Sequence, residues 1–99
     1  MNFKVIFHPE AEKEYAEALE WYEQINAELR QRFKIAILNQ IDLIINNPEL
    51  YQIRKSRYRE SKTEIFPYQI VYTISSSSNV IYIVAIYHTS RNPRKKYRK

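Results

Sequence analysis

The spacing of apolar residues changes along the chain. In the run FKVIF, residues 3–7, alternate side chains fall on two faces, which predicts a short strand. From about residue 9 to residue 46 apolar residues return every three or four positions, which predicts helices. From residue 51 onward the spacing shortens to about two, as in strands. The pattern therefore predicts one strand, a helical region and then several strands.

The helical region divides into two helices. The first opens at His8-Pro9, because proline suits a first turn, and it carries an apolar stripe of Ala11, Tyr15, Ala18, Tyr22 and Ile25. Asn26 can cap a second helix that ends near Pro48, with a stripe of Leu29, Phe33, Ile37, Ile41 and Ile44. The short break between the helices predicts an antiparallel hairpin.

The second half predicts about three strands. YQIVYTI, residues 68–74, alternates clearly, and residues 75–79 form a turn in which Asn79 can take the left-handed backbone conformation. Residues 80–87 are almost all apolar, as in a central strand covered on both faces. The predicted fold class is α+β, a small antiparallel β-sheet packed against an N-terminal helical hairpin (β-α-α-β-β-β). We expect a single domain, 1–99, with a basic tail at 92–99.

Composition excludes several kinds of site. The 99 residues include no cysteine and no glycine, so disulfides, thiolate metal sites and glycine-rich phosphate loops are not expected. We predict no cofactor and no metal. No apolar run reaches the roughly 20 residues that span a bilayer, so we expect a soluble, cytoplasmic protein without membrane contacts.

Charge is divided unequally between the halves. Residues 1–50 contain five Lys/Arg and nine Asp/Glu, a net charge of −4, whereas residues 51–99 contain eleven Lys/Arg and two Asp/Glu, a net charge of +9. Such asymmetry points to partners rather than to a fold. The basic half favours a polyanion or an acidic protein as partner.

The run RKSRYRESK, residues 54–62, is the first candidate site. In a strand, Arg57 and Arg59 would share one face, and Arg54, Tyr58 and Lys62 the other. Cations interleaved with an aromatic ring can bind phosphates and stack a base. A solvated edge strand, whose charges prevent aggregation, is an equally good interpretation.

The run FPY, residues 66–68, is the second candidate. Proline belongs at a strand start or a bulge, and a bulge can redirect the next side chain, Tyr68. Alternatively Phe66 and Tyr68 simply pack under the helices, which the apolar context favours.

The run YHTSRNP, residues 87–93, is the third candidate. Histidine can act as a general acid or base, and arginine can hold a phosphate bidentately. Alternatively His88 bonds a backbone group and Arg91 pairs with an acid of the first helix. Because the same region has no second histidine, catalysis by His88 is not favoured.

Four segments together resemble the RelE/ParE superfamily of toxins from bacterial type II toxin–antitoxin modules. They are, in chain order, HPEAEKEYAEALEWYEQ, RFKIAILNQIDLIINNPELY, FPYQIVYTI and IVAIYHTSRNP. The resemblance covers nearly the whole chain and implies the α+β fold described above. It also implies growth arrest or plasmid stabilization by a toxin that a cognate antitoxin neutralises.

The superfamily contains two mechanisms. RelE-like members cut mRNA on the ribosome with a cluster of cations and a tyrosine; ParE-like members poison DNA gyrase and are not nucleases. If this chain is RelE-like, the resemblance implies a catalytic set of Arg57, Arg59, Lys62, Arg91 and Tyr97. Glu60 and Gln69 stand where RelE-like nucleases often have basic residues, so the ParE-like subgroup is favoured.

The partners follow from the same resemblance. The leading hypothesis is a gyrase inhibitor, the alternative is a ribosome-dependent endoribonuclease, and a third possibility is a non-toxic protein-binding module. We expect the antitoxin to fold a disordered segment onto exposed apolar surface and to direct its acids to the basic half. The predicted target- or antitoxin-binding residues are Arg54, Tyr68, His88 and Arg91.

Overall fold

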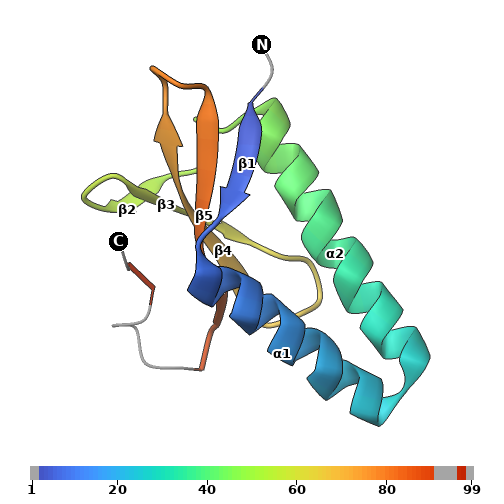
Figure 1. Cartoon of the computed structure of the whole chain (residues 1–99). Coiled ribbons are helices and arrows are strands. Elements are labelled where there is room, and N and C mark those ends of the chain that lie inside the picture. The colour runs from blue at the N-terminus through green and yellow to red at the C-terminus, as the bar shows by residue number, and fades with distance from the viewer. Residues whose placement is uncertain (1–2, 91–95, 98–99) are drawn as a thin grey trace.

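The computed structural model describes residues 3–90 and 96–97. A hairpin of two helices, α1 (Pro9–Ile25) and α2 (Ala27–Asn46), covers one face of a five-stranded sheet (Figure 1). In spatial order the strands are β1 (Lys4–Phe7), β5 (Val80–His88), β4 (Tyr68–Ser75), β3 (Tyr58–Lys62) and β2 (Ile53–Lys55). The predicted α+β class is confirmed.

Two details of the sheet differ from the expected antiparallel arrangement. β1 pairs with β5 in parallel, so the sheet is mixed, because the helical hairpin carries the chain across the sheet before the remaining strands form. The charged segment after α2 forms a hairpin of two strands, β2 and β3, rather than one. Its turn uses Ser56 with a positive φ of 52°, and Asn79 takes the same φ in the β4–β5 turn, as expected.

Side-chain caps begin both helices. Nδ1 of His8 accepts a hydrogen bond from the backbone N–H of Glu10 at 2.9 Å. Oδ1 of Asn26 accepts one from the N–H of Leu29 at 2.7 Å, and the N–H of Asn26 donates to the carbonyl of Tyr22. Asn26 therefore ends α1 and begins α2, which lets the chain reverse within one residue.

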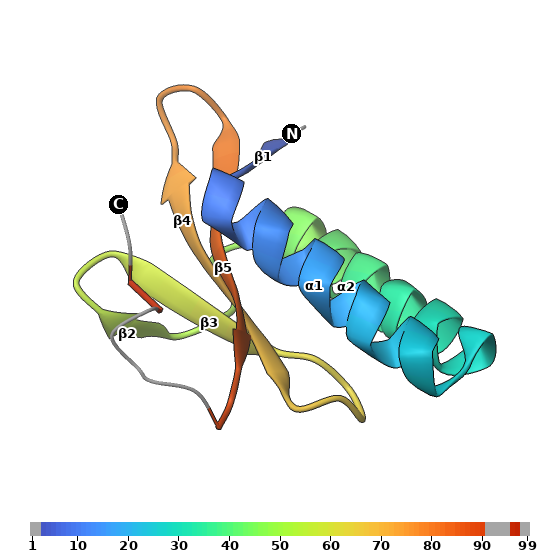
Figure 2. The same cartoon turned by 60° about the horizontal axis from the view of Figure 1, so that its bottom comes forward.

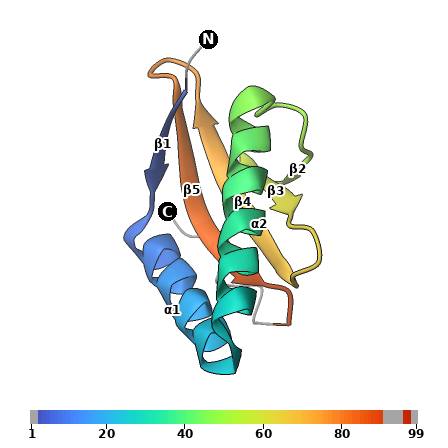
Figure 3. The same cartoon turned by 90° about the vertical axis from the view of Figure 1, so that its right-hand side faces the viewer.

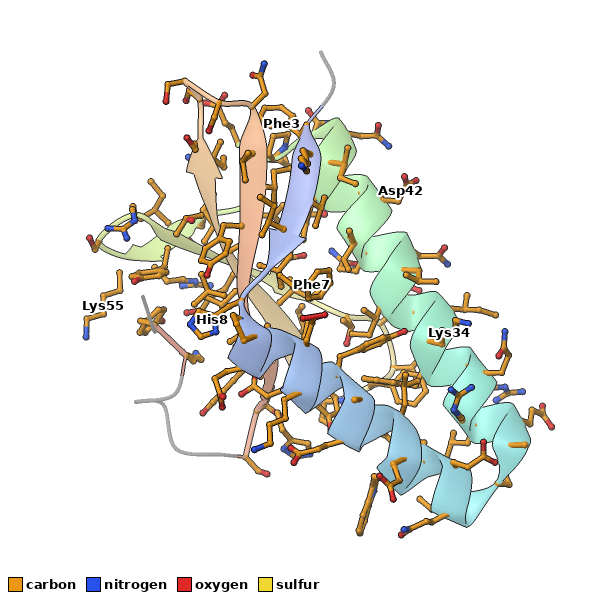
Figure 4. The ribbon with its side chains drawn as sticks, viewed as in Figure 1. Phe3, Phe7, His8, Lys34, Asp42 and Lys55 are labelled. Atoms are coloured by element: carbon orange, nitrogen blue, oxygen red, sulfur yellow. The ribbon has the colours of Figure 1, made fainter. Side chains whose placement is uncertain are left out.

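An aromatic cluster joins the two helices to the sheet. The ring of Phe33, which is fully buried, lies 5.0 Å from the rings of Tyr22 and Tyr68 and 5.2 Å from that of Phe66, between centroids. These spacings are in the range that favours aromatic pairs. Figure 3 views the sheet from the helix side, with α2 in front of β4, and Figure 4 shows Phe7 between β1 and the helices.

The helical stripes are largely confirmed. Ala11, Ala18 and Tyr22 of α1 are buried, as are Phe33, Ile37, Ile41 and Ile44 of α2. Ile25, which the stripe places in the core, is 56% exposed. The helical hairpin extends past the edge of the sheet at its α1–α2 turn (Figure 1), so the end of α1 has no sheet beneath it.

The opposite side of the sheet, which we call the outer face, also carries buried side chains. Val71 of β4 and both Val84 and Ala85 of β5 are buried in a second apolar cluster. A register shift between β4 and β5 pairs Val71 with Ala85 and Tyr72 with Ile83, so Val84 is an extra residue in β5. Such a bulge places two neighbouring side chains on one face. β5 is thus covered on both faces, as its apolar run predicts.

Candidate functional site

The outer face is the main candidate site, and part of the C-terminal segment lies on it. Tyr58 and Tyr87 are buried in its apolar cluster, and Tyr97 packs against that cluster. The rings of Tyr58 and Tyr97 are 5.2 Å apart. In Figure 2 the described end of the chain lies beside β2 and β3, on the side of the sheet away from the helices.

Glu60 of β3 joins this face to the C-terminal segment. Its Oε1 lies 3.1 Å from Nζ of Lys96, and its Oε2 accepts a hydrogen bond from the hydroxyl of Tyr97. Only 7% of the Glu60 side chain is exposed, and 17% of that of Lys96. Both carboxylate oxygens therefore have a partner, as a buried carboxylate requires.

Cations lie over the aromatic rings of the same face. Nζ of Lys96 is 5.0 Å from the ring centroid of Tyr87, and Nζ of Lys55 is 5.5 Å from that of Tyr97. The guanidinium of Arg57 is 5.4 Å from the ring of Tyr58. These are cation–π distances. Figure 4 shows Lys55 at the β2 end of the molecule, far from Lys34 and Asp42 on α2.

The environment of Tyr97 suppresses its ionisation. Burial raises the pKa of Tyr97 to about 12, and its hydrogen bond to Glu60 and the negative charge of that carboxylate act in the same direction. The positive charge of Arg54 opposes them. Tyr97 is therefore a neutral hydrogen-bond donor to Glu60 near pH 7.

Arg59 does not belong to this face, and its predicted grouping with Arg57 is wrong. Arg57 lies in the β2–β3 turn, whereas Arg59 is within β3. Nη1 of Arg59 donates to the carbonyls of Tyr51, at 2.7 Å, and Glu49, at 3.2 Å. Arg59 thus fastens the loop between α2 and β2, because successive side chains of a strand point to opposite sides.

The other predicted catalytic residues are placed unequally. Lys62 is exposed at the end of β3, on the same side of the strand as Tyr58 and Glu60. Tyr97 reaches this side as well. Arg91 lies outside the described residues. The outer face therefore carries Arg57 and Tyr97 beside Tyr58 at one end of β3 and Lys62 at its other end, with Arg54 in the adjoining strand β2.

Tyr68 and His88 lie together at the end of the sheet near α1. Tyr68 is buried in the aromatic cluster, with 5% of its surface exposed, as the packing interpretation expects. The ring of His88 meets it edge-on at 5.0 Å. Nδ1 of His88 accepts a hydrogen bond from the N–H of Ser90 at 3.1 Å. Both line a cavity of about 550 Å³, with Glu17, Ala18, Trp21 and Ser90.

A second hollow, which we call the α2 groove, lies between α2 and the β3–β4 loop. It measures about 650 Å³, and its apolar lining is Leu29, Ile35, Ala36, Leu43, Ile65 and Phe66. Ile65 is 95% exposed and has a positive φ of 72°, which is unfavourable for a β-branched residue. The groove is thus an exposed apolar surface bordered by an unusual loop.

Two structural features are absent from the part of the chain that the structure describes. Residues 3–90 and 96–97 contain no group of three or more His, Cys, Asp or Glu side chains that could hold a metal ion. Within the same ranges no helix is both long enough and apolar enough to cross a bilayer.

Comparison with known proteins identifies the family. Residues 5–93 match the family model described as "ParE toxin of type II toxin-antitoxin system, parDE". The chain belongs to this ParE toxin family. No curated protein matches the toxin in the corresponding sequence comparison.

Solved structures share the toxin's fold. A chain from the chromosomal ParDE toxin–antitoxin system of P. aeruginosa aligns with a TM-score of 0.74 and 14% identity, over 89% of this chain and 97% of that one. The isolated E. coli RelE toxin aligns with a TM-score of 0.58 and 15% identity, over 95% and 90%. A double mutant of RelE in its free state also gives 0.58 and 15%, over 91% and 86%.

Glu60 and Lys96, like Lys55 and Tyr87, are residues of this face that the sequence analysis did not select as site residues. The alternation of Tyr58, Glu60 and Lys62 within one strand was the available signal for Glu60. No pattern in the sequence indicates that Lys96 and Tyr97 return to β3, because that contact joins residues 36 and 37 positions apart.

We predict that Arg59→Met destabilises the toxin more than Arg57→Met. Losing charged hydrogen bonds to two loop carbonyls should lower the free energy of unfolding by about 1.5–3 kcal/mol. Arg57, exposed in its turn, should change it by less than about 0.5 kcal/mol. Urea denaturation measures the free energy of unfolding of both variants. Equal losses of stability would show that Arg59 does not hold the loop.

We also predict that Tyr97→Phe removes one ionisation near pH 12 from the alkaline absorbance titration of tyrosinate. Tyr97 should ionise near pH 10 when unfolded and near 12 when folded. Because the folded state favours the protonated form of Tyr97, the stabilisation that this gives is fully present below pH 10. It is lost as the pH rises toward 12. A difference curve between the two proteins isolates Tyr97, and no difference near pH 12 would contradict the docked position.

Proposed function

We propose that this ParE-family toxin arrests growth in the bacterial cytoplasm by inhibiting DNA gyrase, and that its antitoxin neutralises it. The observation that carries the proposal is the carboxylate of Glu60 on the outer face, which is bonded to Lys96 and Tyr97. The family match supports it, because the matched family is ParE rather than RelE.

Cleavage of RNA by cations needs positive charge at the scissile phosphate to stabilise the charged transition state. The outer face instead holds the negative carboxylate of Glu60, and Lys96 and Tyr97 are both bonded to it. Arg59, a predicted member of the catalytic set, bonds loop carbonyls instead. Because Lys96, Tyr97 and Arg59 are all bonded within the protein, these contacts argue against nuclease chemistry and favour the gyrase proposal.

Ribosome-dependent cleavage of mRNA is the second candidate. It is favoured by the shared location of Arg57, Lys62 and Tyr97 on one side of the sheet. The third candidate, a binding module without toxicity, predicts that production of the protein alone leaves growth unchanged. Growth arrest that the neighbouring antitoxin gene relieves would exclude it.

We predict that the purified toxin inhibits supercoiling by gyrase, or traps DNA cleaved by it, and leaves mRNA intact in a translation reaction. The antitoxin complex, tested at the same concentration, is the control and should be inactive in the gyrase assay. Cleaved mRNA with normal supercoiling would instead support the second candidate.

The α2 groove is the surface that we propose for the antitoxin. Its exposed apolar side chains include Leu43, 53% exposed, and Ile35, 48% exposed, on the outward side of α2. An amphipathic segment of a partner can bury such a stripe while it folds. The charged residues at the groove are Arg32, which is paired with Glu28, and the acids Asp42 and Glu64, so the apolar stripe rather than charge supports this site.

We predict that Leu43→Asp weakens antitoxin binding by at least about tenfold, or about 1.4 kcal/mol, because a charge would be buried in the interface. The matched control is Ile25→Asp, at an equally exposed position (56%) that lies outside the groove. Titration calorimetry with the purified antitoxin compares them. Equal affinities for the two variants would place the antitoxin elsewhere.

A further inference from the structure

The outer face has the composition of a surface that binds single-stranded nucleic acid. Tyrosine rings and cations lie next to each other on it, as the distances from Arg57 to Tyr58 and from Lys96 to Tyr87 show. Exposed Lys62 extends the positive charge along β3. Rings that can stack bases, beside cations that can follow a phosphate backbone, suit a single strand.

A carboxylate of the toxin itself is bonded to two of the hydrogen-bond donors of this surface. Glu60 projects from β3 between Tyr58 and Lys62, and its oxygens are bonded to Lys96 and Tyr97. A carboxylate and a phosphate oxygen accept the same charge-assisted hydrogen bonds from lysine. While Glu60 is bonded in this way, its negative charge offsets that of Lys96 and weakens the attraction of Lys96 for a phosphodiester.

Residues 96–97 also cover the aromatic part of the face. The ring of Tyr97 lies on that of Tyr58, and Nζ of Lys96 lies over that of Tyr87. A base could stack on these rings only after the two residues had moved away. The same contact therefore blocks both components of recognition, the phosphate and the base.

We propose that Glu60 is an internal latch, which holds residues 96–97 on the outer face and prevents this face from binding single-stranded nucleic acid. The latch is a competition between two anions for one set of donors, the carboxylate of β3 and a phosphodiester. The proposal goes beyond gyrase inhibition and does not depend on it.

Removal of the carboxylate charge should open the face. Glu60→Gln keeps the size of the side chain but loses the ion pair with Lys96 and the charged acceptor for Tyr97. Released Lys96 and neighbouring Lys55 could then contact phosphates. Each additional phosphate contact makes the dependence of log affinity on log salt steeper by about 0.7 for a single strand.

The experiment measures the fluorescence anisotropy of a labelled single-stranded RNA of about 20 nucleotides, long enough to cross the face. We expect Glu60→Gln to bind at least about tenfold more tightly than the wild-type toxin, with a steeper salt dependence. Glu64→Gln is the matched control, because it removes the same charge from an exposed position four residues away. Equal binding by the two variants would overturn the proposal.

A second variant distinguishes the effect of losing the latch on RNA binding from the effect of changing the net charge. Tyr97→Ala leaves the charge unchanged but removes both the hydroxyl bonded to Glu60 and the ring on Tyr58. It should also bind the RNA more tightly than the wild-type toxin, and unchanged or weaker binding would overturn the proposal, even if Glu60→Gln fails to fold.

The alkaline titration gives an independent measure of release. In Glu60→Gln the ionisation of Tyr97 should move from about 12 toward its ordinary value of 10.0, because burial and Glu60 both raise it in the wild-type toxin. A pKa that falls only part of the way would mean that burial, the largest cause of the raised value, persists and that residues 96–97 stay docked without the carboxylate, and the latch would be refuted.

Discussion

The packing of one phenylalanine against three other aromatic rings connects the layers of this toxin. Phe33 comes from α2, Tyr22 from α1, and Phe66 and Tyr68 from the segment that opens β4. Through this cluster both helices contact the segment that opens β4, because Tyr22 and Phe33 each lie against Phe66 and Tyr68. The cluster also orients the start of β4, where Tyr68 meets His88 of β5. Two of the three candidate sites from the sequence, the FPY run and the run that contains His88, thus contribute residues that pack in or against the core.

The two faces of the sheet have different tasks because strand side chains alternate. Arg59 and Glu60 are neighbours in the sequence, yet one fastens the loop after α2 and the other receives the C-terminal segment. A shift of one residue in β3 would exchange these roles. The functional character of the outer face therefore depends on the register of β3 against β4, in which Arg59 pairs with Tyr72 and Glu60 with Val71.

The charge asymmetry of the chain becomes a spatial one in the fold. The acidic residues of α1 lie with the helices, and the basic residues of β2 and β3 lie at the other end of the sheet (Figure 1). The apolar α2 groove belongs to the first layer and the outer face to the second. An antitoxin that occupies the groove and reaches the basic hairpin would meet both surfaces.

The sequence by itself determined the elements and most of the core. Apolar periodicity predicted both helices and the strands β4 and β5, and Asn26 and Asn79 marked their boundaries, because these signals depend on neighbouring residues only. The resemblance of four motifs predicted the superfamily, which the family match confirmed. Only the tertiary structure decided that Arg59 turns inward and that Lys96 and Tyr97 return to Glu60. These contacts join residues far apart in the chain. The free energy that they contribute depends on how deeply the complete fold buries the polar groups.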